Sequence, residues 1–361
     1  MNTKNHPSST RESEIVHMRR IVCVGLLLIV TCTPVLAECT WTGIQRIIAV
    51  GDIHGDYAQL VAVLRSAGVI NKRNRWTGGK THLVQMGDLI DRGPDSRRVM
   101  DFLMDLEKQA SRSGGYVHCL IGNHEAMNIY GDLSHVTPEE FASFRDANSE
   151  KVREVFYERH LEELAADPNK AANVKPDEAY RKAWEEKHPL GYFEHRFQFG
   201  PNGTYGKWIG AHNAIIQIND SIFVHGGISP KYADMPFDVV NNRIREELKD
   251  LSLLKGGLVT DTDGPLWYRG LATDDETALA EQVKLVLDFH NARRIVIGHT
   301  PIRGTIAPRC GGKVIVIDVG LSAYYGSHMS WLLIEGDNVY AVQQGERQLI
   351  PFAEPAVKTH P

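Results

Sequence analysis

Three segments that begin with glycine recur at nearly constant spacing, and each follows a short apolar run. They start at Gly51, Gly87 and Gly122, so the intervals are 36 and 35 residues (51 to 87, then 87 to 122). Each interval is about the length of one strand–helix–strand unit with a parallel crossover. Glycine at a strand end allows a tight turn and a close approach of the backbone. The spacing therefore predicts an α/β fold whose first sheet is mainly parallel.

The stretches between these segments alternate between strand-like and helix-like patterns. Residues 95–110, for example, carry Val99, Leu103 and Leu106 on one helical face. The predicted elements of this first part are 45–50, 57–67, 82–86, 95–110 and 116–121. A second set of strands is predicted at 214–218, 222–225, 295–298, 314–319, 330–334 and 339–343, with only one helix, about 275–289, among them. The two sets favour two sheets packed together with helices outside.

Residues from about 128 to 200 interrupt this alternation. They are rich in Glu, Ala, Lys and Arg, and they lack the rhythm of the strands. Helices are predicted here at 138–147, 151–165 and 176–187. We interpret the segment as a helical insertion over or beside the active site, within a single domain that spans residues 38–361.

Residues 1–37 have the pattern of a secretory signal peptide. A basic pair precedes an uncharged run that ends at the small residue Ala37. The apolar centre of the run is shorter than the about 20 residues that a membrane helix needs, although an uncleaved anchor is the alternative. Met1 and Met18 are both candidate translation starts. We expect an exported protein, periplasmic or secreted, with no stable membrane insertion after cleavage.

Charge and cysteine content narrow the expected partners. The formal net charge of −5 gives no general attraction to nucleic acid, so no such partner is expected. Beyond the predicted signal lie Cys39, Cys119 and Cys310, at spacings that match no zinc motif. Cys119 falls in an apolar run and is expected to be buried. Cys39 and Cys310 are a candidate disulfide in an oxidising compartment. Nothing in the sequence indicates the oligomeric state.

Polar side chains follow five of the predicted strands at the point where each strand ends. Ligands gather beyond the carboxyl ends of strands in α/β sheets, so these side chains are expected to converge. Imidazole, carboxylate and amide oxygen suit Mn, Fe or Zn. Six ligands suit two divalent or trivalent ions, about 3.5–4 Å apart, that share one carboxylate. The predicted ligands are Asp52, His54, Asp88, Asn123, His225 and His299, with Asp88 as the shared one.

Other residues near this set suit phosphate chemistry. Arg92 and Arg269 are candidates to clamp a phosphate, and Asn123 would help to stabilise its charge. His124 follows a predicted ligand directly, so it is expected to face the substrate and to protonate a leaving oxygen. Asp91 would hold the His124 ring and raise its basicity.

Taken alone, each of these residues has a simpler interpretation. A Gly-Asp pair is usually a turn, and an isolated histidine is usually satisfied in a core or solvated. Asp318 also follows an apolar strand, and we interpret it as structural. Three further histidines are interpreted as core or surface residues: His118, His195 and His212. The ordered combination of five segments is what favours a metal site.

At these residues the sequence resembles the phosphoprotein phosphatase family of calcineurin-like metallophosphoesterases. Segments 51–55, 87–93 and 122–125 match its three signature segments, and 225–227 matches the fourth. The resemblance spans about residues 46–343. It implies a β-sandwich flanked by helices, a bimetal centre and direct transfer of phosphate to water. It also implies the roles given above to the six ligands, to the two arginines, and to His124 and Asp91 as an acid dyad.

Within that family the sequence is most similar to the Shewanella-like protein phosphatases. The similarity lies in residues 122–133, 266–269 and 298–301. Residues 322–325 differ from the C-terminal motif that the eukaryotic Ser/Thr enzymes use with microbial toxins. Toxin sensitivity and a Ser/Thr preference are therefore not carried over, and a phosphotyrosine preference stays open.

We therefore predict a metal-dependent phosphatase that hydrolyses phosphomonoesters by in-line attack of a hydroxide held between two metals. Its expected substrates are proteins phosphorylated on Tyr or Ser/Thr, or small phosphomonoesters. A hydrolase of dinucleoside polyphosphates or nucleotides shares the first three segments and is the alternative. A catalytically inactive binding module is disfavoured, because every expected ligand is present.

Overall fold

The computed structural model describes residues 38–352, except residues 168, 170–173 and 303. The predicted signal peptide lies outside the described residues, so it stays a prediction. None of the helices in the described ranges combines the length and the apolar character that a membrane span needs.

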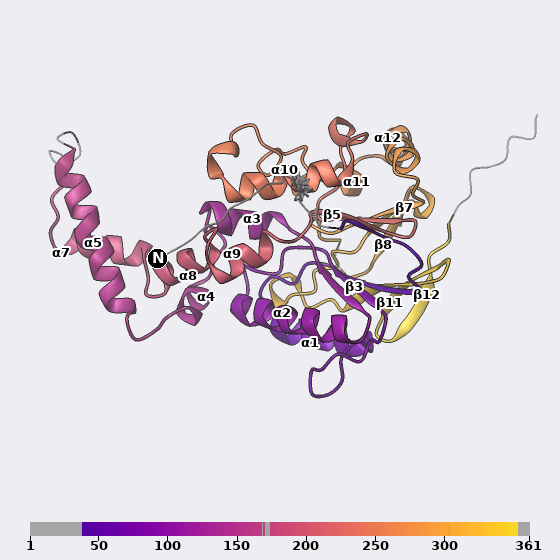
Figure 1. The fold of residues 1–361 in the computed structure, drawn as a ribbon, viewed down its shortest axis with the longest axis horizontal. Helices are drawn as coiled ribbons and strands as arrows, with labels where there is room; N and C mark the ends of the chain where they lie inside the picture. Colours follow the sequence, from indigo (N-terminus) through magenta and orange to yellow (C-terminus); the bar gives the residue numbers. More distant parts are fainter. Residues whose placement is uncertain (1–37, 168, 170–173, 303, 353–361) are drawn as a thin grey trace, which may run out of the picture. The chain divides into compact units, whose positions relative to one another are not determined.

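Two mixed sheets of six strands each form the centre of the fold (Figure 1). The first has the order β12-β11-β10-β2-β3-β4, and the second has the order β1-β5-β6-β7-β9-β8. The strands of the first are β2 (Arg46–Val50), β3 (His82–Gln85), β4 (Tyr116–Cys119), β10 (Ser330–Glu335), β11 (Asn338–Gln343) and β12 (Glu346–Leu349). Those of the second are β1 (Thr40–Trp41), β5 (Ile215–Ile218), β6 (Ser221–Val224), β7 (Arg294–Ile297), β8 (Ala307–Arg309) and β9 (Val314–Val316). The predicted α/β architecture of two sheets is confirmed.

Each sheet contains a run of three parallel strands: β2-β3-β4 in the first and β6-β7-β9 in the second. β2, β6, β7 and β9 are largely apolar because both of their faces are covered, whereas β3 and β4 also contain His82, Gln85 and His118. Ile48 and Val84 in the first sheet, and Phe223 and Val296 in the second, are fully buried. The carboxyl ends of the parallel strands position the site described below.

The first sheet is parallel in only half of its strands, so the expectation of a mainly parallel sheet is corrected. β10 pairs antiparallel with β2, and β11 and β12 continue the antiparallel part. A tight turn joins β10 to β11. Such a short connection can join only antiparallel strands, because parallel strands need a long crossover. Leu333 lies opposite Ile48, so the edge of β2 is covered by a buried apolar strand.

Helices cover the outer faces of both sheets, as predicted. In Figure 1, α1 (Tyr57–Ser66) and α2 (Ser96–Arg112) lie below the first sheet, and α10 (Phe237–Lys249) and α12 (Glu276–Phe289) lie above the second. The prediction of only one helix among the later strands is wrong, because α10 and the short α11 (Gly270–Thr273) also lie there. Val240, Ile244 and Leu248 bury one face of α10 at helical spacing, a signal that the sequence contained.

The segment from 128 to 200 is helical, as predicted, and holds more helices than expected. Its helices, with the flanking ones, are α3 (Asn123–Tyr130), α4 (Pro138–Ser143), α5 (Ser149–Ala166), α7 (Glu178–Lys187), α8 (Tyr192–Phe199) and α9 (Thr204–Ile209). α4 is shorter than the predicted 138–147, and α8 was not expected. Figure 1 shows α5 and α7 side by side, with α8 between them and the sheets.

The candidate disulfide between Cys39 and Cys310 is wrong. Both residues are free thiols, and so is Cys119, which is buried as expected. Cys39 precedes β1 and Cys310 follows β8, and these are the two outer strands of the second sheet. Neighbouring strands lie about 4.8 Å apart, so five steps across the sheet give about 24 Å. A disulfide needs Cα atoms within about 7 Å.

Candidate active site

The three parallel strands of each sheet end at a common place, and a polar residue follows each of these six strands. The first sheet brings Asp52, Asp88 and Asn123 after its three parallel strands, and the second brings His225, His299 and Asp318. All six residues are buried, with at most 4% of each exposed to solvent. The structure thus brings together every residue that the sequence predicted as a ligand, and adds Asp318.

The backbone of the site is strained at residues that carry side chains. The φ angles are 45° at His54, 52° at Asp88, 70° at Asp91, 66° at Arg92 and 64° at His299. Left-handed backbone is unfavourable for residues with a Cβ atom, and it persists where the surroundings hold it. Such strain gathers at functional sites. The loops are therefore held in one conformation that aims these side chains inward.

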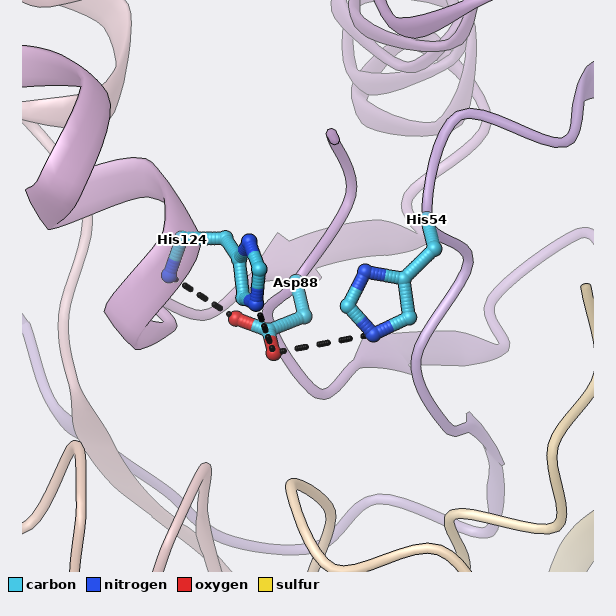
Figure 2. A group of neighbouring side chains, drawn as sticks. All are labelled: His54, Asp88 and His124. Atoms are coloured by element: carbon cyan, nitrogen blue, oxygen red, sulfur yellow. Dashed lines mark hydrogen bonds and ion pairs between the residues drawn. The ribbon is translucent and has the colours of Figure 1, made fainter. Parts of the chain in front are cut away.

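Asp88 lies at the centre of the site and belongs to both candidate metal groups. The first group is His54, Asp88 and His124, and the second is Asp88, His225 and His299. Figure 2 shows Asp88 between His54 and His124, whose Nε2 atoms are each 3.8 Å from Asp88 Oδ2. His225 Nε2 lies 3.2 Å from Asp88 Oδ1. This geometry suits a carboxylate that is shared by two ions.

Three histidines turn a nitrogen lone pair into the site. Each bonds with its other ring nitrogen to a backbone carbonyl, which can only accept a hydrogen bond, so that nitrogen carries the proton. The bonds are His54 Nδ1 to Ile90 (3.2 Å), His225 Nδ1 to Met86 (2.8 Å) and His299 Nε2 to Trp267 (3.2 Å). Such an outer bond fixes ring orientation and raises the basicity of a metal ligand.

The inward-facing atoms of the second group are all acceptors when the histidines are neutral. His225 Nε2 lies 3.0 Å from Asn123 Oδ1 and 3.2 Å from His299 Nδ1. With Asp88 Oδ1 this makes four lone-pair donors around one point. Burial lowers the pKa of His225, but Asp88, Glu125 and the Met86 carbonyl together outweigh burial and raise it, so a cation is favoured here. A metal ion is a cation that all four atoms can bind at once.

Three buried carboxylates increase the demand for positive charge. Burial, Asp318 and Asp88 together raise the pKa of Asp52 well above its usual value. Burial raises the pKa of Asp318 to about 6. Asp52 also accepts the backbone N–H of His299 at 3.1 Å. Nitrogen and oxygen donors without thiolate suit Mn, Fe or Zn, so the residues fit the two ions that the sequence predicted.

His124 is held differently from the other histidines. Its Nδ1 lies 2.6 Å from Asp91 Oδ2, and Asn128 Nδ2 donates to both Asp91 oxygens. Burial lowers the pKa of His124, but Asp88 and Asp91 outweigh it and raise the value. Burial instead lowers the pKa of His54 to about 3. A histidine that keeps its proton is a poorer ligand, so His124 is suited to donate that proton although it lies within the first group.

The two predicted phosphate-binding arginines lie beside different groups. Arg92 Nη1 is 2.9 Å from His54 Nε2, and it also donates to the Tyr325 hydroxyl. Arg269 Nη1 donates to the His299 carbonyl at 2.8 Å and is exposed. One guanidinium therefore lies beside each of the two candidate metal groups, where a planar fork of N–H donors suits a bound oxyanion.

Several residues of the site were not predicted. The Glu125 carboxylate accepts the backbone N–H groups of Asp88, Leu89 and Gly122 at 2.8–2.9 Å. Its signal was its place three residues after Gly122 at the start of α3, where acidic side chains cap a helix. Asn128, one turn after His124 on the same helix, and Tyr325, distant in sequence, gave no comparable signal.

Comparisons with known proteins agree with this geometry. The family model of the calcineurin-like phosphoesterases matches residues 45–303. An uncharacterised protein of Schizosaccharomyces pombe is 32% identical, over 83% of this chain and 81% of that protein. Shewanella-like protein phosphatase 2 of Arabidopsis thaliana is 29% identical, over 77% and 72%. The solved structure of a cold-active protein-tyrosine phosphatase from a psychrophilic Shewanella species is 26% identical, with a TM-score of 0.66 over 87% of this chain and 84% of that one.

Replacing Asp88 by Asn should remove bound metal, because both candidate groups lose their shared negative ligand. Affinity should fall by more than about 100-fold, since even residues outside the ligand shell cost about 10–100-fold. Elemental analysis after dialysis measures the change. Asp220→Asn is the matched control, because Asp220 pairs with Arg294 at the opposite end of β6. Retention of both ions by Asp88→Asn would contradict the shared position.

Glu125→Gln should weaken metal binding about 10–100-fold, because an amide nitrogen would then face one of the three backbone N–H groups that position Asp88. Titration against a chelating dye measures the affinity. Glu247→Gln is the control. Glu247 lies in α10, and its carboxylate accepts the backbone N–H groups of Leu258 and Val259. Equal metal affinity in the two variants would show that Glu125 has no special link to the metal centre.

Proposed function

Because the chain belongs to the calcineurin-like phosphoesterase family and is a hydrolase of phosphoesters, we propose that it is a metal-dependent phosphatase acting on phosphomonoesters, phosphorylated proteins above all. The observation that carries the proposal is the juxtaposition of three parts. Two donor groups share Asp88, one arginine lies beside each group, and His124 of the first group is bonded to Asp91. This combination suits a dianionic phosphate whose leaving oxygen needs a proton.

Each part has a task in this reaction. Two bound cations, held by Asp52, His54, Asp88, Asn123, His225 and His299, would supply Lewis-acid charge and an acidified water. Arg92 and Arg269 bind the phosphate oxygens and stabilise the charge that develops in the transition state. Asp91 holds Nδ1 of His124, so that Nε2 presents its proton to the leaving oxygen.

Phosphotyrosine is the substrate that we propose first. The rings of Tyr324 and Tyr325 lie 5.6 and 5.3 Å from the Arg92 guanidinium, and 65% of Tyr324 is exposed. Aromatic rings pack well on such a surface. The solved Shewanella relative is named a protein-tyrosine phosphatase, which supports the same choice. A dinucleoside polyphosphate hydrolase is the alternative, because its substrates also carry phosphate and a flat ring.

A substrate panel tests the proposal. With added manganese, we expect hydrolysis of a phosphotyrosine peptide to exceed that of a phosphoserine peptide, and both to exceed that of diadenosine tetraphosphate. Phosphate release gives kcat/KM for each. Faster turnover of the dinucleotide than of either peptide would favour the alternative function, and no hydrolysis of any substrate by metal-loaded protein would exclude a phosphatase.

His124→Ala should lower kcat about 10²–10⁴-fold for a phosphoserine peptide, the usual size of general acid catalysis. The loss should be small for p-nitrophenyl phosphate, because that leaving group departs without a proton. Steady-state kinetics measure both rates. His135→Ala is the control, since the His135 ring lies 5.0 Å from that of His124 without a bond to Asp91. An unchanged kcat for the peptide would remove His124 from the role of acid.

A further inference from the structure

The side chain of Asn128 in α3 makes all of its hydrogen bonds to the proposed acid dyad. Its Nδ2 donates to Asp91 Oδ1 at 2.9 Å, to Asp91 Oδ2 at 3.0 Å and to the His124 carbonyl at 3.0 Å. All three residues are buried, with at most 2% of each exposed. Asn128 follows His124 by four residues, about one helical turn, so both side chains stand on the same face of α3 and reach the same carboxylate.

The other end of the Asn128 amide has no partner. Its Oδ1 is buried and makes no hydrogen bond within the described residues. The atoms opposite Nδ2 are carboxylate and carbonyl oxygens, which accept hydrogen bonds, so a turned amide would set Oδ1 against a carboxylate. Buried polar atoms are nearly always bonded, and each exception needs an explanation. The orientation of this amide is explained by Asp91 and not by the packing around Oδ1.

Asp91 depends on bonds from other residues for its position. Its φ angle of 70° lies in the left-handed region, which is unfavourable for a residue with a Cβ atom. Its backbone N–H donates to the Ser96 hydroxyl at 3.0 Å, and its Oδ2 lies 2.6 Å from His124 Nδ1. Within the described residues, Asn128 is the only donor to Asp91 Oδ1. The terminal torsion of an aspartate is soft, so without this donor the carboxylate would turn more freely against His124.

The helical segment holds Asn128 in turn. Arg196 of α8 donates from Nη1 to the Asn128 carbonyl, and from Nη2 to the Ile129 carbonyl at 3.2 Å. Both carbonyls lie in the last turn of α3, where a helix has no partners of its own for its C=O groups. A guanidinium is favoured there by hydrogen bonding and by the helix dipole. Arg196 therefore fixes the part of the helix from which Asn128 reaches Asp91.

We propose that Asn128 is a positioning residue for the acid dyad, and that Arg196 keeps it in place. The Asn128 amide fixes the Asp91 carboxylate at the angle that meets Nδ1 of His124, so that Nε2 presents its proton to the leaving oxygen. The inference rests on the proposed function, because it takes His124 as the acid. It makes α8, which belongs to the helical segment from 128 to 200, part of the apparatus that protonates the leaving group.

The test compares kcat of the metal-loaded protein for a phosphoserine peptide and for p-nitrophenyl phosphate. Asn128→Ala should lose about 10–100-fold on the peptide, the usual effect of removing an outer partner of an active-site residue. It should lose less than about threefold on p-nitrophenyl phosphate, because that leaving group departs without a proton.

Arg196→Met is the second variant, because it keeps the apolar stem of the side chain and removes its donors. It should lose about 3–30-fold on the peptide, less than Asn128→Ala, since it acts on Asp91 through the helix. Its rate on p-nitrophenyl phosphate should stay close to that of the parent. This variant carries the test if Asn128→Ala fails to fold.

Two matched controls lie in α10, and neither is bonded to the dyad or to the metal groups within the described residues. Asn241 is a buried amide that bonds the backbone of Ala214 and Ile215. Arg245 Nη1 donates to the His212 carbonyl at 3.2 Å. Asn241→Ala and Arg245→Met remove equivalent groups, and both should leave the ratio of the two rates unchanged.

The outcomes separate this inference from the proposed function. Equal losses on the two substrates for Asn128→Ala or Arg196→Met, or no loss on the peptide, would overturn the role given to that residue. A selective loss in Asn241→Ala as large as that in Asn128→Ala would also overturn it. If His124→Ala shows the selective loss and Asn128→Ala does not, only this inference fails. If His124→Ala shows none, the assignment of the acid in the proposed function fails with it.

Discussion

The structure depends on one electrostatic constraint: buried negative charge must be neutralised where the parallel strands end. Asp52, Asp88 and Asp318 enter the same small volume, and three histidines point lone pairs into it. Like charges at this depth repel strongly because little solvent screens them. Backbone strain, backbone-bonded histidines and the Glu125 cap all hold these acceptors together despite that repulsion. Such an arrangement makes sense in a protein that binds cations.

Glycine is what permits the close approach of these elements. A Cβ atom at Gly122 would lie 2.3 Å from Asp88 Oδ1, and one at Gly298 would lie 2.6 Å from Asp52 Oδ1. No larger residue fits at either place without displacing a carboxylate. Gly122, one of the three glycines that opened the sequence analysis, and Gly298 therefore leave room for the carboxylates of Asp88 and Asp52.

The sequence predicts a structural feature well where residues close in the chain determine it, and poorly where distant residues do. Residues that directly follow a parallel strand, such as Asp88 and His225, were placed correctly because strand topology alone brings them together. Tyr325 reaches Arg92 from 233 positions away, a distance in sequence over which no periodicity carries information. The strands at 330–334 and 339–343 were predicted, but their pairing with β2 in the first sheet was missed for the same reason. The predicted disulfide was wrong because the number of cysteines in the chain does not indicate which edge of a sheet each cysteine occupies.

The helical segment divides into two parts with different freedom to change. α3 and α4 are hydrogen-bonded to residues 91–97, and α8 packs on α4, so substitutions in these helices are expected to disturb the proposed acid dyad. α5 and α7 contact each other, as in the Tyr157–Trp184 ring pair, and within the described residues neither helix is hydrogen-bonded to residues 91–97. Diversification of partner choice among descendants of this protein is therefore expected to accumulate in the outer hairpin, while the inner helices stay under purifying selection.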